Sequence, residues 1–540
     1  MKRHDLPKGR IPDTRAQNEI SELLGGPPYR RDLLIEYLHA VQDRYGCISL
    51  DHIAALAAQM RLAQTEVYEV ATFYAHFDVT AETRPRRPVV RVCQSLSCAL
   101  AGGAAVLASC QADPHMDARP APCMGACDKA PACMIEKYAL APATAETITD
   151  HVTRHRFAPS LPAYQTAEAY REAGGYAMLE KLRRGDIGRE ELLATLSASQ
   201  LRGLGGAGFP SVRKWQLVMA QPKPRLLAVN ADEGEPGTFK DRYYLEREPH
   251  RFLEGLLIAA WAIEAEDIYI YLRDEYPALH MLLAREIATL AEAPRIHLRR
   301  GAGAYICGEE SAMLESLEGK RGLPRHKPPF PGEVGLFGRP TLVHNVETLF
   351  WLPTLLERGA EWFTRQGHNG RVGLRSFSVS GRVRSPGVKL APAGITARAL
   401  IEDYCEGMAD GHVFHAYLPG GASGGILPAA LADVPLDFGT LEPHGCFIGS
   451  AALIVLSDKD DLAMVAHNLM QFFAEESCGQ CTPCRNGTEK ALGLLGQESW
   501  DKPLLTELAH VMGDASICGL GQAACNPVKS ILRYFPEVGA

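Results

Sequence analysis

The sequence has 540 residues and a formal net charge of -8, and 46% of its residues are hydrophobic. This length allows several domains with buried cores, and the acidic balance argues against nucleic acid as a partner. The most apolar stretch, residues 255–263, is too short to span a bilayer, so we expect no membrane insertion. The polar start of the chain does not resemble a signal peptide, and we expect a cytoplasmic protein.

The first predicted elements are helices. Apolar residues recur at helical spacing between residues 31 and 77, in one stripe that stops at Gly46 and a second that begins near Thr65, a plausible N-cap. A short strand over 89–92 then leads directly into Cys93. A helix over 104–110 and a strand over 132–135 complete a small α/β unit, and 159–162 is a predicted linker.

The middle of the chain mixes helices, strands and glycine-rich turns, as α/β domains do. Strands are predicted over 226–229 and 268–272. Residues 375–457 are rich in glycine, proline and strand-forming residues, which predicts a small α+β insert. The helical pattern returns from Leu462 onward. The chain is therefore predicted to be a multidomain α/β protein.

Fifteen cysteines without a secretory signal predict metal binding or redox chemistry rather than disulfides. Eight of them fall into two groups: Cys93, Cys98, Cys123 and Cys127, and then Cys478, Cys481, Cys484 and Cys518. The remaining seven are scattered, and we expect them to be small buried core residues.

The second group begins with a C-x-x-C-x-x-C run, which can present three thiolates to a 4Fe–4S cluster while the fourth ligand comes from far along the chain. Cys518 and Cys525 compete for the fourth place. The glycines around Cys518 let the backbone fold closely around a cluster, which favours Cys518. Structural zinc is the alternative, although zinc usually takes paired C-x-x-C hooks.

The first group consists of two hooks, Cys93-x₄-Cys98 and Cys123-x₃-Cys127, about 25 residues apart. Their gaps are longer than those of zinc knuckles and suit a 2Fe–2S cluster in which each hook holds one end. Zinc remains the alternative here as well. Cys133 could replace Cys127 on chemical grounds, but its predicted strand makes it a poor loop ligand.

Residues 203–208 match the pattern G-x-G-x-x-G. A dinucleotide-binding fingerprint requires a strand directly before the glycines, whereas residues 190–201 are predicted to be helical. The ordinary dinucleotide interpretation is therefore rejected. What remains is a backbone that a planar ring or a phosphate can approach closely, followed by Phe209, which could stack on a ring.

Charged side chains follow the next predicted strand and two later turns. They are Asp232, Glu233 and Glu235, then Glu309 and Glu310, and then Lys327 beside Phe330 in a proline-rich loop. Carboxylates can accept hydrogen bonds from ribose hydroxyls, a lysine can balance a phosphate, and an aromatic ring can stack on adenine. A solvated turn is the alternative for the first three carboxylates.

These motifs carry a resemblance to a known family. Residues 203–209, 230–242, 300–310, 327–331 and 477–485 resemble the NADH-binding flavin subunit of respiratory complex I, from about residue 175 to the end. The first 160 residues are similar to the small 2Fe–2S subunit of that complex. Both occur here on one chain, as in NAD-dependent formate dehydrogenases and NAD-reducing hydrogenases. The whole chain most resembles the beta subunit of molybdenum- or tungsten-dependent formate dehydrogenases.

The resemblance implies five parts. They are an N-terminal helical segment (1–85), a thioredoxin-like 2Fe–2S domain (86–160), a Rossmann-like α/β domain for FMN and NAD (161–372), a small ubiquitin-like α+β domain (373–457) and a helical 4Fe–4S bundle (458–540).

The resemblance also implies roles for single residues. FMN would be held by Gly203, Gly205, Gly206, Lys214, Asn230, Asp232, Glu233, Gly308, Glu309 and Asn345. NAD(H) would be positioned by Phe209, Glu235, Glu310, Lys327 and Phe330, and among these we expect Glu235 and Glu310 to shape the catalytic site. The family pattern selects Cys518 over Cys525. Two positions depart from it: Leu204 stands where arginine is frequent, and His344 stands where asparagine precedes Asn345.

The implied activity is hydride transfer between NAD(H) and FMN, with single-electron transfer through the clusters. The implied partner is an alpha subunit with a molybdenum or tungsten centre and further Fe–S clusters, and the implied reaction converts formate and NAD+ to CO2 and NADH. The diaphorase subunit of an NAD-reducing hydrogenase and a fused complex I subunit are alternatives. A zinc-stabilised, non-catalytic interaction module is an alternative of a different class.

Overall fold

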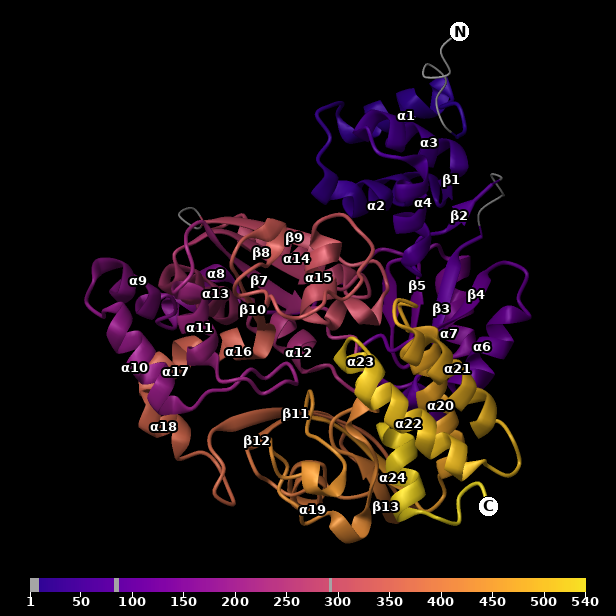
Figure 1. Cartoon of the computed structure of the whole chain (residues 1–540), viewed down its shortest axis with the longest axis vertical. Coiled ribbons are helices and arrows are strands. Elements are labelled where there is room, and N and C mark those ends of the chain that lie inside the picture. The colour runs from indigo at the N-terminus through magenta and orange to yellow at the C-terminus, as the bar shows by residue number, and fades with distance from the viewer. Residues whose placement is uncertain (1–8, 82–86, 291–293) are drawn as a thin grey trace.

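The computed structural model describes residues 9–81, 87–290 and 294–540 (Figure 1). Within these ranges the elements form four sheets with their helices, followed by a C-terminal helical bundle. The predicted boundary between the first two parts, at 85/86, lies outside the described residues. No helix in the described ranges is long and apolar enough to cross a membrane.

The N-terminal part is helical, as predicted, with α1 (Thr14–Leu24), α2 (Leu34–Tyr45), α3 (Leu50–Met60), α4 (Gln64–Phe73) and a short parallel pair, β1 (Ile48–Ser49) and β2 (Val79–Thr80). Helix α2 ends at Gly46, whose φ of 81° is the left-handed conformation that glycine adopts without strain. The predicted N-cap of α4 is wrong: Ala63 occupies that position, and Thr65 lies inside the first turn. The tight turn after α3, in which the Leu62 amide donates to Ala57, sets this start rather than a capping side chain.

The small α/β unit contains a sheet in the order β4-β3-β5-β6. Its strands are β3 (Val89–Cys93), β4 (Asp117–Ala121), β5 (Cys133–Ile135) and β6 (Tyr138–Leu140), and its helices are α5 (Leu96–Leu100), α6 (Gly103–Gln111) and α7 (Ala145–Thr153). Strand β3 pairs with β4 in parallel and with β5 antiparallel. Because β3 ends at Cys93 and β5 begins at Cys133, Cys93 passes directly into a loop, whereas Cys133 is part of the ladder.

The central sheet is parallel, with the strand order β10-β7-β8-β9. Its strands are β7 (Arg225–Ala231), β8 (Ala265–Leu272), β9 (Arg295–Arg300) and β10 (Thr341–Asn345). Asn230 and Asn345 are register partners at the carboxyl ends of β7 and β10. In open parallel sheets this edge is where ligands bind.

Helices surround the central sheet. They are α8 (Ala167–Glu172), α9 (Ala177–Arg184), α10 (Arg189–Ser199), α11 (Ser211–Met219), α12 (Lys240–Arg247), α13 (Pro249–Ile263), α14 (Pro277–Ile287), α15 (Glu310–Leu317), α16 (Val346–Phe350), α17 (Leu352–Arg358) and α18 (Ala360–Thr364). Helix α13 is buried over nearly its whole length, which explains why its apolar run resembles a core helix and not a span. The residues between α7 and α8 form no helix or strand, as predicted for the linker.

The insert is a mixed five-stranded sheet in the order β12-β11-β15-β13-β14, which confirms the predicted strand-rich segment. Its elements are β11 (Leu374–Gly381), β12 (Gly387–Pro392), α19 (Ala397–Ala399), β13 (Phe414–Leu418), β14 (Leu427–Pro428) and β15 (Ala452–Ser457). The C-terminal bundle follows with α20 (Leu462–Glu475), α21 (Thr482–Leu495), α22 (Lys502–Ala515), α23 (Gly519–Ala523) and α24 (Asn526–Tyr534).

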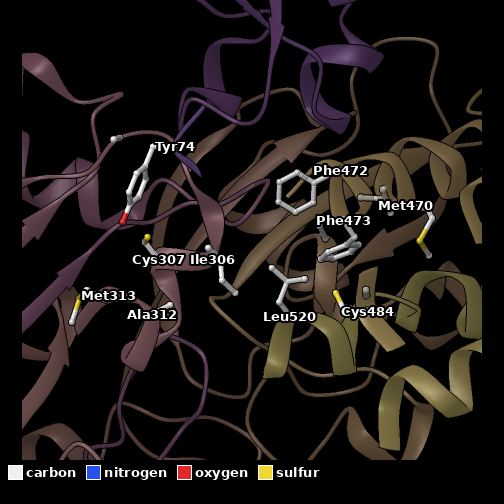
Figure 2. Close-up of a cluster of buried hydrophobic side chains, with 14 of the residues drawn as sticks. Tyr74, Ile306, Cys307, Ala312, Met313, Met470, Phe472, Phe473, Cys484 and Leu520 are labelled. Carbon is white, nitrogen blue, oxygen red and sulfur yellow. The ribbon is translucent and has the colours of Figure 1, made fainter. Parts of the chain in front are cut away.

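One hydrophobic cluster joins the N-terminal helices, the central domain and the C-terminal bundle (Figure 2). Tyr74 belongs to the first, Ile306 to the second, and Phe473 and Leu520 to the third, and all are buried. Burying a side chain of this size contributes about 1.5–3 kcal/mol. The shared core therefore holds the two cysteine-bearing parts in place against the central domain.

Candidate functional site

A cavity of about 260 Å³ lies at the carboxyl ends of β7 and β10. Eight residues that the sequence singled out line it: Gly205, Gly206, Asn230, Glu233, Glu235, Gly308, Glu309 and Asn345. Other parts of the wall come from segments far apart in the sequence, including Ser423 and Phe447 of the insert and Leu520 of the bundle. The structure thus brings the predicted flavin residues together and closes the cavity with residues that no motif had indicated.

The glycine-rich loop follows helix α10 and not a strand, as predicted. The amide of Gly203 donates to the carbonyl of Phe209, 2.8 Å away, and closes the loop at its base. Gly208 has a φ of 64°, in the left-handed region. A Cβ on Gly205 would lie 2.9 Å from the Cβ of Asn345, closer than two carbon atoms pack. The loop therefore leaves its backbone open to the cavity, as a flat ring system requires.

The two departures from the family pattern lie outside the cavity wall. Leu204 is buried in the central core, and its amide donates to Thr348 Oγ1, 2.9 Å away. His344 lies beneath Trp215, whose Nε1 donates to His344 Nε2 over 2.6 Å. Burial, with the nearby charge of Lys214, lowers the pKa of His344 to about 3, so the ring is neutral and accepts this hydrogen bond.

The acidic segment after β7 is held by its own backbone. Glu233 has a φ of 23°, and its carboxylate accepts hydrogen bonds from the amides of Asp241 (2.7 Å) and Arg242 (3.0 Å) at the start of α12. Burial raises the pKa of Glu233 to about 7. Asn230 Nδ2 donates to the carbonyl of Gly308 over 2.7 Å. These contacts fix the turn and, with it, one wall of the cavity.

Glu235 is held at a second wall. Its Oε1 accepts hydrogen bonds from the amide and from Oγ of Ser423, each 2.7 Å away, and its Oε2 accepts one from the Tyr305 hydroxyl. Burial raises the pKa of this carboxyl. Ser423 and Tyr305 line the cavity as well, so a carboxylate from the central domain is oriented by a hydroxyl from the insert.

Seven predicted residues do not line the cavity: Gly203, Phe209, Lys214, Asp232, Glu310, Lys327 and Phe330. Three of them form an ion-pair group beside the wall residue Glu309. Lys327 Nζ lies 2.8 Å from Glu309 and 2.9 Å from Glu310, and Lys214 Nζ lies 3.2 Å from Glu310. Burial opposes the ionisation of Glu310, but the two lysines outweigh it and lower the pKa of its carboxyl.

The other four predicted residues have different surroundings. Gly203 lies at the base of the glycine loop. Phe209 and Phe330 are exposed, with 41% and 54% of their surface accessible. Asp232 is buried behind the wall, 3.5 Å from the position of a Cβ on Gly308, and burial raises the pKa of its carboxyl.

Sequence reasoning missed a buried lysine in the cavity wall. The side chain of Lys240 is 1% exposed and lies 3.1 Å from Asp241 and 2.8 Å from Glu347. Burial alone would lower the pKa of Lys240, but these carboxylates raise it, so the amine stays charged. Asp241 also accepts a hydrogen bond from Asn345 Nδ2, 2.7 Å away. A single lysine at a helix start carries no motif, so only the fold could reveal it.

The first cysteine group lies on the far side of the acidic segment. The thiols of Cys123 and Cys127 are 3.3 Å apart, and the thiols of Cys93 and Cys98 form a hydrogen bond with each other. Phe239, at the start of α12, packs against Cys123 and Cys127. The thiols thus meet as the two pairs that the hooks predict.

A buried arginine connects this group to the cavity wall. Arg273 Nη2 donates to the carbonyl of Cys123 over 2.5 Å, and Arg273 Nη1 donates to the carbonyl of Glu233 over 2.6 Å. Its side chain is 4% exposed and is paired with Glu275, 2.9 Å away. One guanidinium therefore binds the backbone of both the cysteine loop and the acidic loop.

The second cysteine group borders the cavity directly. Cys484 is buried, whereas Cys478, Cys481 and Cys518 are partly exposed. Gly519 and Leu520, which follow Cys518, line the cavity, and a Cβ on Gly521 would lie 2.9 Å from Cys484 Cβ. By contrast, Cys525 is buried with its thiol 3.4 Å from the sulfur of Met512. This placement favours Cys518 over Cys525.

The remaining cysteines agree largely with the expectation of core residues. Six are buried and Cys47 is partly exposed. In the part of the chain that is described, no three His, Cys, Asp or Glu side chains surround a point that could hold a single metal ion.

Three family models match the chain. They describe a thioredoxin-like [2Fe-2S] ferredoxin over residues 20–156, the Nuo51 FMN-binding domain over 196–354 and the NADH-ubiquinone oxidoreductase-F iron-sulfur binding region over 464–538. The chain is 40% identical to an F subunit of the NADH-quinone oxidoreductase of Rhizobium meliloti, the one numbered 2, over 395 residues, which are 69% of this chain and 94% of that protein. The chain belongs to the family of NADH-quinone oxidoreductase F subunits. A second member, the F subunit of Aquifex aeolicus, is 38% identical over 70% of this chain and 91% of its own.

A solved structure matches this F-type chain over nearly its whole length. It is a chain of an NAD+-reducing [NiFe]-hydrogenase in the H2-reduced state, with a TM-score of 0.82, 31% identity, and coverage of 94% of this chain and 93% of that one. The chain is thus an NADH-binding electron-transfer subunit, and its cofactors are FMN, a 2Fe–2S cluster and a 4Fe–4S cluster. The zinc alternatives are set aside for both cysteine groups.

Proposed function

We propose that this chain is the NAD(H)-handling diaphorase subunit of a cytoplasmic, multisubunit formate dehydrogenase. The observation that carries the diaphorase part is the common wall: the segments around one cavity also contact both cysteine groups. When bound there, FMN can exchange electron pairs with a nicotinamide and single electrons with iron–sulfur clusters. The cavity is free of side chains where the glycine loop faces it, which suits the flavin.

In this proposal the cavity residues hold FMN. Gly205 and Gly206 admit the ring, and Asn230, Glu233, Gly308, Glu309 and Asn345 surround it. Gly203, Lys214 and Asp232 lie behind this wall and act as positioning residues. Lys240 adds a permanently charged amine that can face the anionic groups of the flavin.

NAD(H) is proposed to enter between the ion-pair group and the insert. Lys214 and Lys327 can each exchange a carboxylate partner for a phosphate, while Glu310 remains ionised and can accept a ribose hydroxyl. The exposed rings of Phe209 and Phe330 are available for stacking. Glu235, oriented by Ser423, is placed to align the nicotinamide for transfer.

The eight grouped cysteines are the proposed cluster ligands. Cys93, Cys98, Cys123 and Cys127 would hold 2Fe–2S, and Cys478, Cys481, Cys484 and Cys518 would hold 4Fe–4S. Three ligands of the second group are partly exposed, so we propose that the 4Fe–4S site is oriented towards the partner subunit.

The proposed partner is a molybdenum- or tungsten-containing alpha subunit that oxidises formate and carries further Fe–S clusters. This choice is supported by the resemblance of the fused chain to formate dehydrogenase beta subunits. A hydrogenase partner is the second candidate, and the solved structure favours it, since a hydrogenase chain matches 94% of this one. A fused complex I subunit remains an alternative.

The native complex separates these candidates. It should be purified anaerobically from its source with a tag on this chain, and NADH formation should be measured with formate or with hydrogen as the only donor. Formate-dependent NADH, with molybdenum or tungsten in the complex, supports the proposal. Hydrogen-dependent NADH with nickel in the complex would replace it with the second candidate. If neither donor works while NADH reduces an artificial dye, the diaphorase assignment stands and the formate assignment fails.

A further inference from the structure

A second cavity, of about 130 Å³, lies on the other face of the glycine loop. It shares no lining residue with the flavin cavity. Arg202 and Leu204 line it from the glycine loop, Arg371 and Arg375 from the start of the insert, and Asp437 and Phe438 from a later turn of the insert. Nothing in the proposed electron-transfer function uses this cavity.

The cavity holds more positive charge than its own residues neutralise. Arg375 is paired with Asp437, and its side chain is 5% exposed. Among the described residues, no carboxylate lies within ion-pair distance of Arg202 or Arg371. Three guanidinium groups thus share one carboxylate. Burial lowers the pKa of Arg375, and Arg202 acts in the same direction.

Two of these arginines are arranged around one aromatic ring. The guanidinium carbons of Arg202 and Arg375 lie 5.6 Å and 4.3 Å from the ring centroid of Phe438. The ring orders both side chains through cation–π contacts. The buried Nε of Arg375 has no hydrogen-bond partner in the described residues. A buried charged donor without a partner is costly, so an occupant of the cavity would be stabilised by it.

We propose that this cavity is a binding site for a phosphate-class oxyanion. Guanidinium groups present a rigid fork of donors that matches phosphate oxygens, and two unpaired arginines match the charge of a dianion. A volume of 130 Å³ is several times the ~30 Å³ that one water molecule occupies, which suits a tetrahedral ion. Leu204 and Phe438 supply an apolar wall that keeps the ion pairs from being fully solvated.

The site connects the insert to the base of the glycine loop. Arg202 and Pro210 form an isolated antiparallel bridge there, and a Cβ on Gly208 would lie 2.7 Å from the ring of Phe438. A bound oxyanion would join Arg202 of the loop to Arg371 of the insert and so restrain the loop. Its expected consequence, slower loss of FMN, rests on the proposed function of the flavin cavity.

The test uses the full, FMN-loaded chain at constant ionic strength. Inorganic phosphate is titrated by isothermal calorimetry, with chloride as the background anion and AMP as a comparison ligand. We expect saturable binding of one phosphate per chain, and Arg371→Gln should weaken it at least tenfold. Arg202→Gln should have the same direction. Because neither side chain is fully buried or ion-paired, both variants should fold.

Arg365→Gln is the matched control. Arg365 lies shortly before the insert, pairs only with Glu361 within its helix end, and does not line the cavity. It should bind phosphate as the wild type does. If AMP binds at least as tightly as phosphate and is also lost in Arg371→Gln, the oxyanion comes from a nucleotide and the site stands.

Absence of saturable phosphate binding in the wild type would overturn the site, and so would equal binding by wild type and Arg371→Gln. The FMN release rate, measured by fluorescence with and without phosphate, reports on the loop. If the purified chain carries no flavin, the proposed function fails, but phosphate binding can still be measured on the same protein. The two failures are therefore distinguishable.

Discussion

Gly205→Ala tests whether the glycine loop must be free of side chains for flavin to bind. The new methyl group would lie 2.9 Å from Asn345 Cβ. Asn345 cannot easily turn away, because its Oδ1 accepts hydrogen bonds from the amide (3.0 Å) and hydroxyl (2.9 Å) of Thr348, and its Nδ2 donates to Asp241. The side that remains open to it is the cavity, so relief of the clash reduces the space for FMN.

The size of the effect follows from the overlap. Carbon atoms pack at about 3.5–4.0 Å, so the loop or Asn345 must move by roughly 0.6 Å or more. Overpacking of this kind typically costs about 1–3 kcal/mol. If the cost falls on the flavin-bound state, the dissociation constant for FMN rises roughly 5- to 150-fold, at about 1.4 kcal/mol per factor of ten.

The assay is a fluorescence titration of FMN into the flavin-free chain under anaerobic conditions. Gly188→Ala is the control, because a Cβ at that glycine meets nothing within 4 Å and its backbone is extended. The control should bind FMN as the wild type does. An unchanged FMN affinity in Gly205→Ala would refute the placement of the flavin against this loop.

Three further predictions follow from the same site. Cys481→Ser should remove the 4Fe–4S signal in electron paramagnetic resonance but keep FMN and NADH–dye activity; loss of flavin as well would contradict the separation of the two sites. Arg273→Met should lower the reduction potential of the 2Fe–2S cluster, since a buried positive charge next to Cys123 stabilises the reduced form, whereas Arg273→Lys should shift it less; a redox titration with the 4Fe–4S signal as internal reference shows which holds. His344 is held neutral with a pKa of about 3, below its usual ~6.5, so the unfolded chain binds the extra proton and stability falls as pH drops through 6.5 towards 3. His344→Gln should flatten this acid loss, which amounts to about 2 kcal/mol between pH 6.5 and 5 for the wild type; equal pH dependence of the thermal midpoint in both proteins would contradict it.

The cysteine spacing and the helical stripes carried most of the prediction. A thiol pattern such as C-x-x-C-x-x-C is local, because three ligands on one loop must be close in sequence, and the described thiols of the first group do meet in the predicted pairs. The Thr65 cap failed because the turn from α3 competes with local capping preference. The assignment of FMN and NAD contacts to single residues stays a prediction, since it came from resemblance, and the domain boundaries likewise stay predictions.

By itself, the sequence determined which chemistry the chain can hold: clustered thiols, a backbone without side chains over 203–208, and carboxylates at a strand end. The tertiary structure alone decided the wall that joins them. Lys240, Ser423 and Phe447 reach the cavity, and Arg273 reaches both loops, only because the parallel sheet, the insert and the bundle pack against one another. Local patterns specify residues a few positions apart, whereas contacts between such distant segments depend on burial of a shared core.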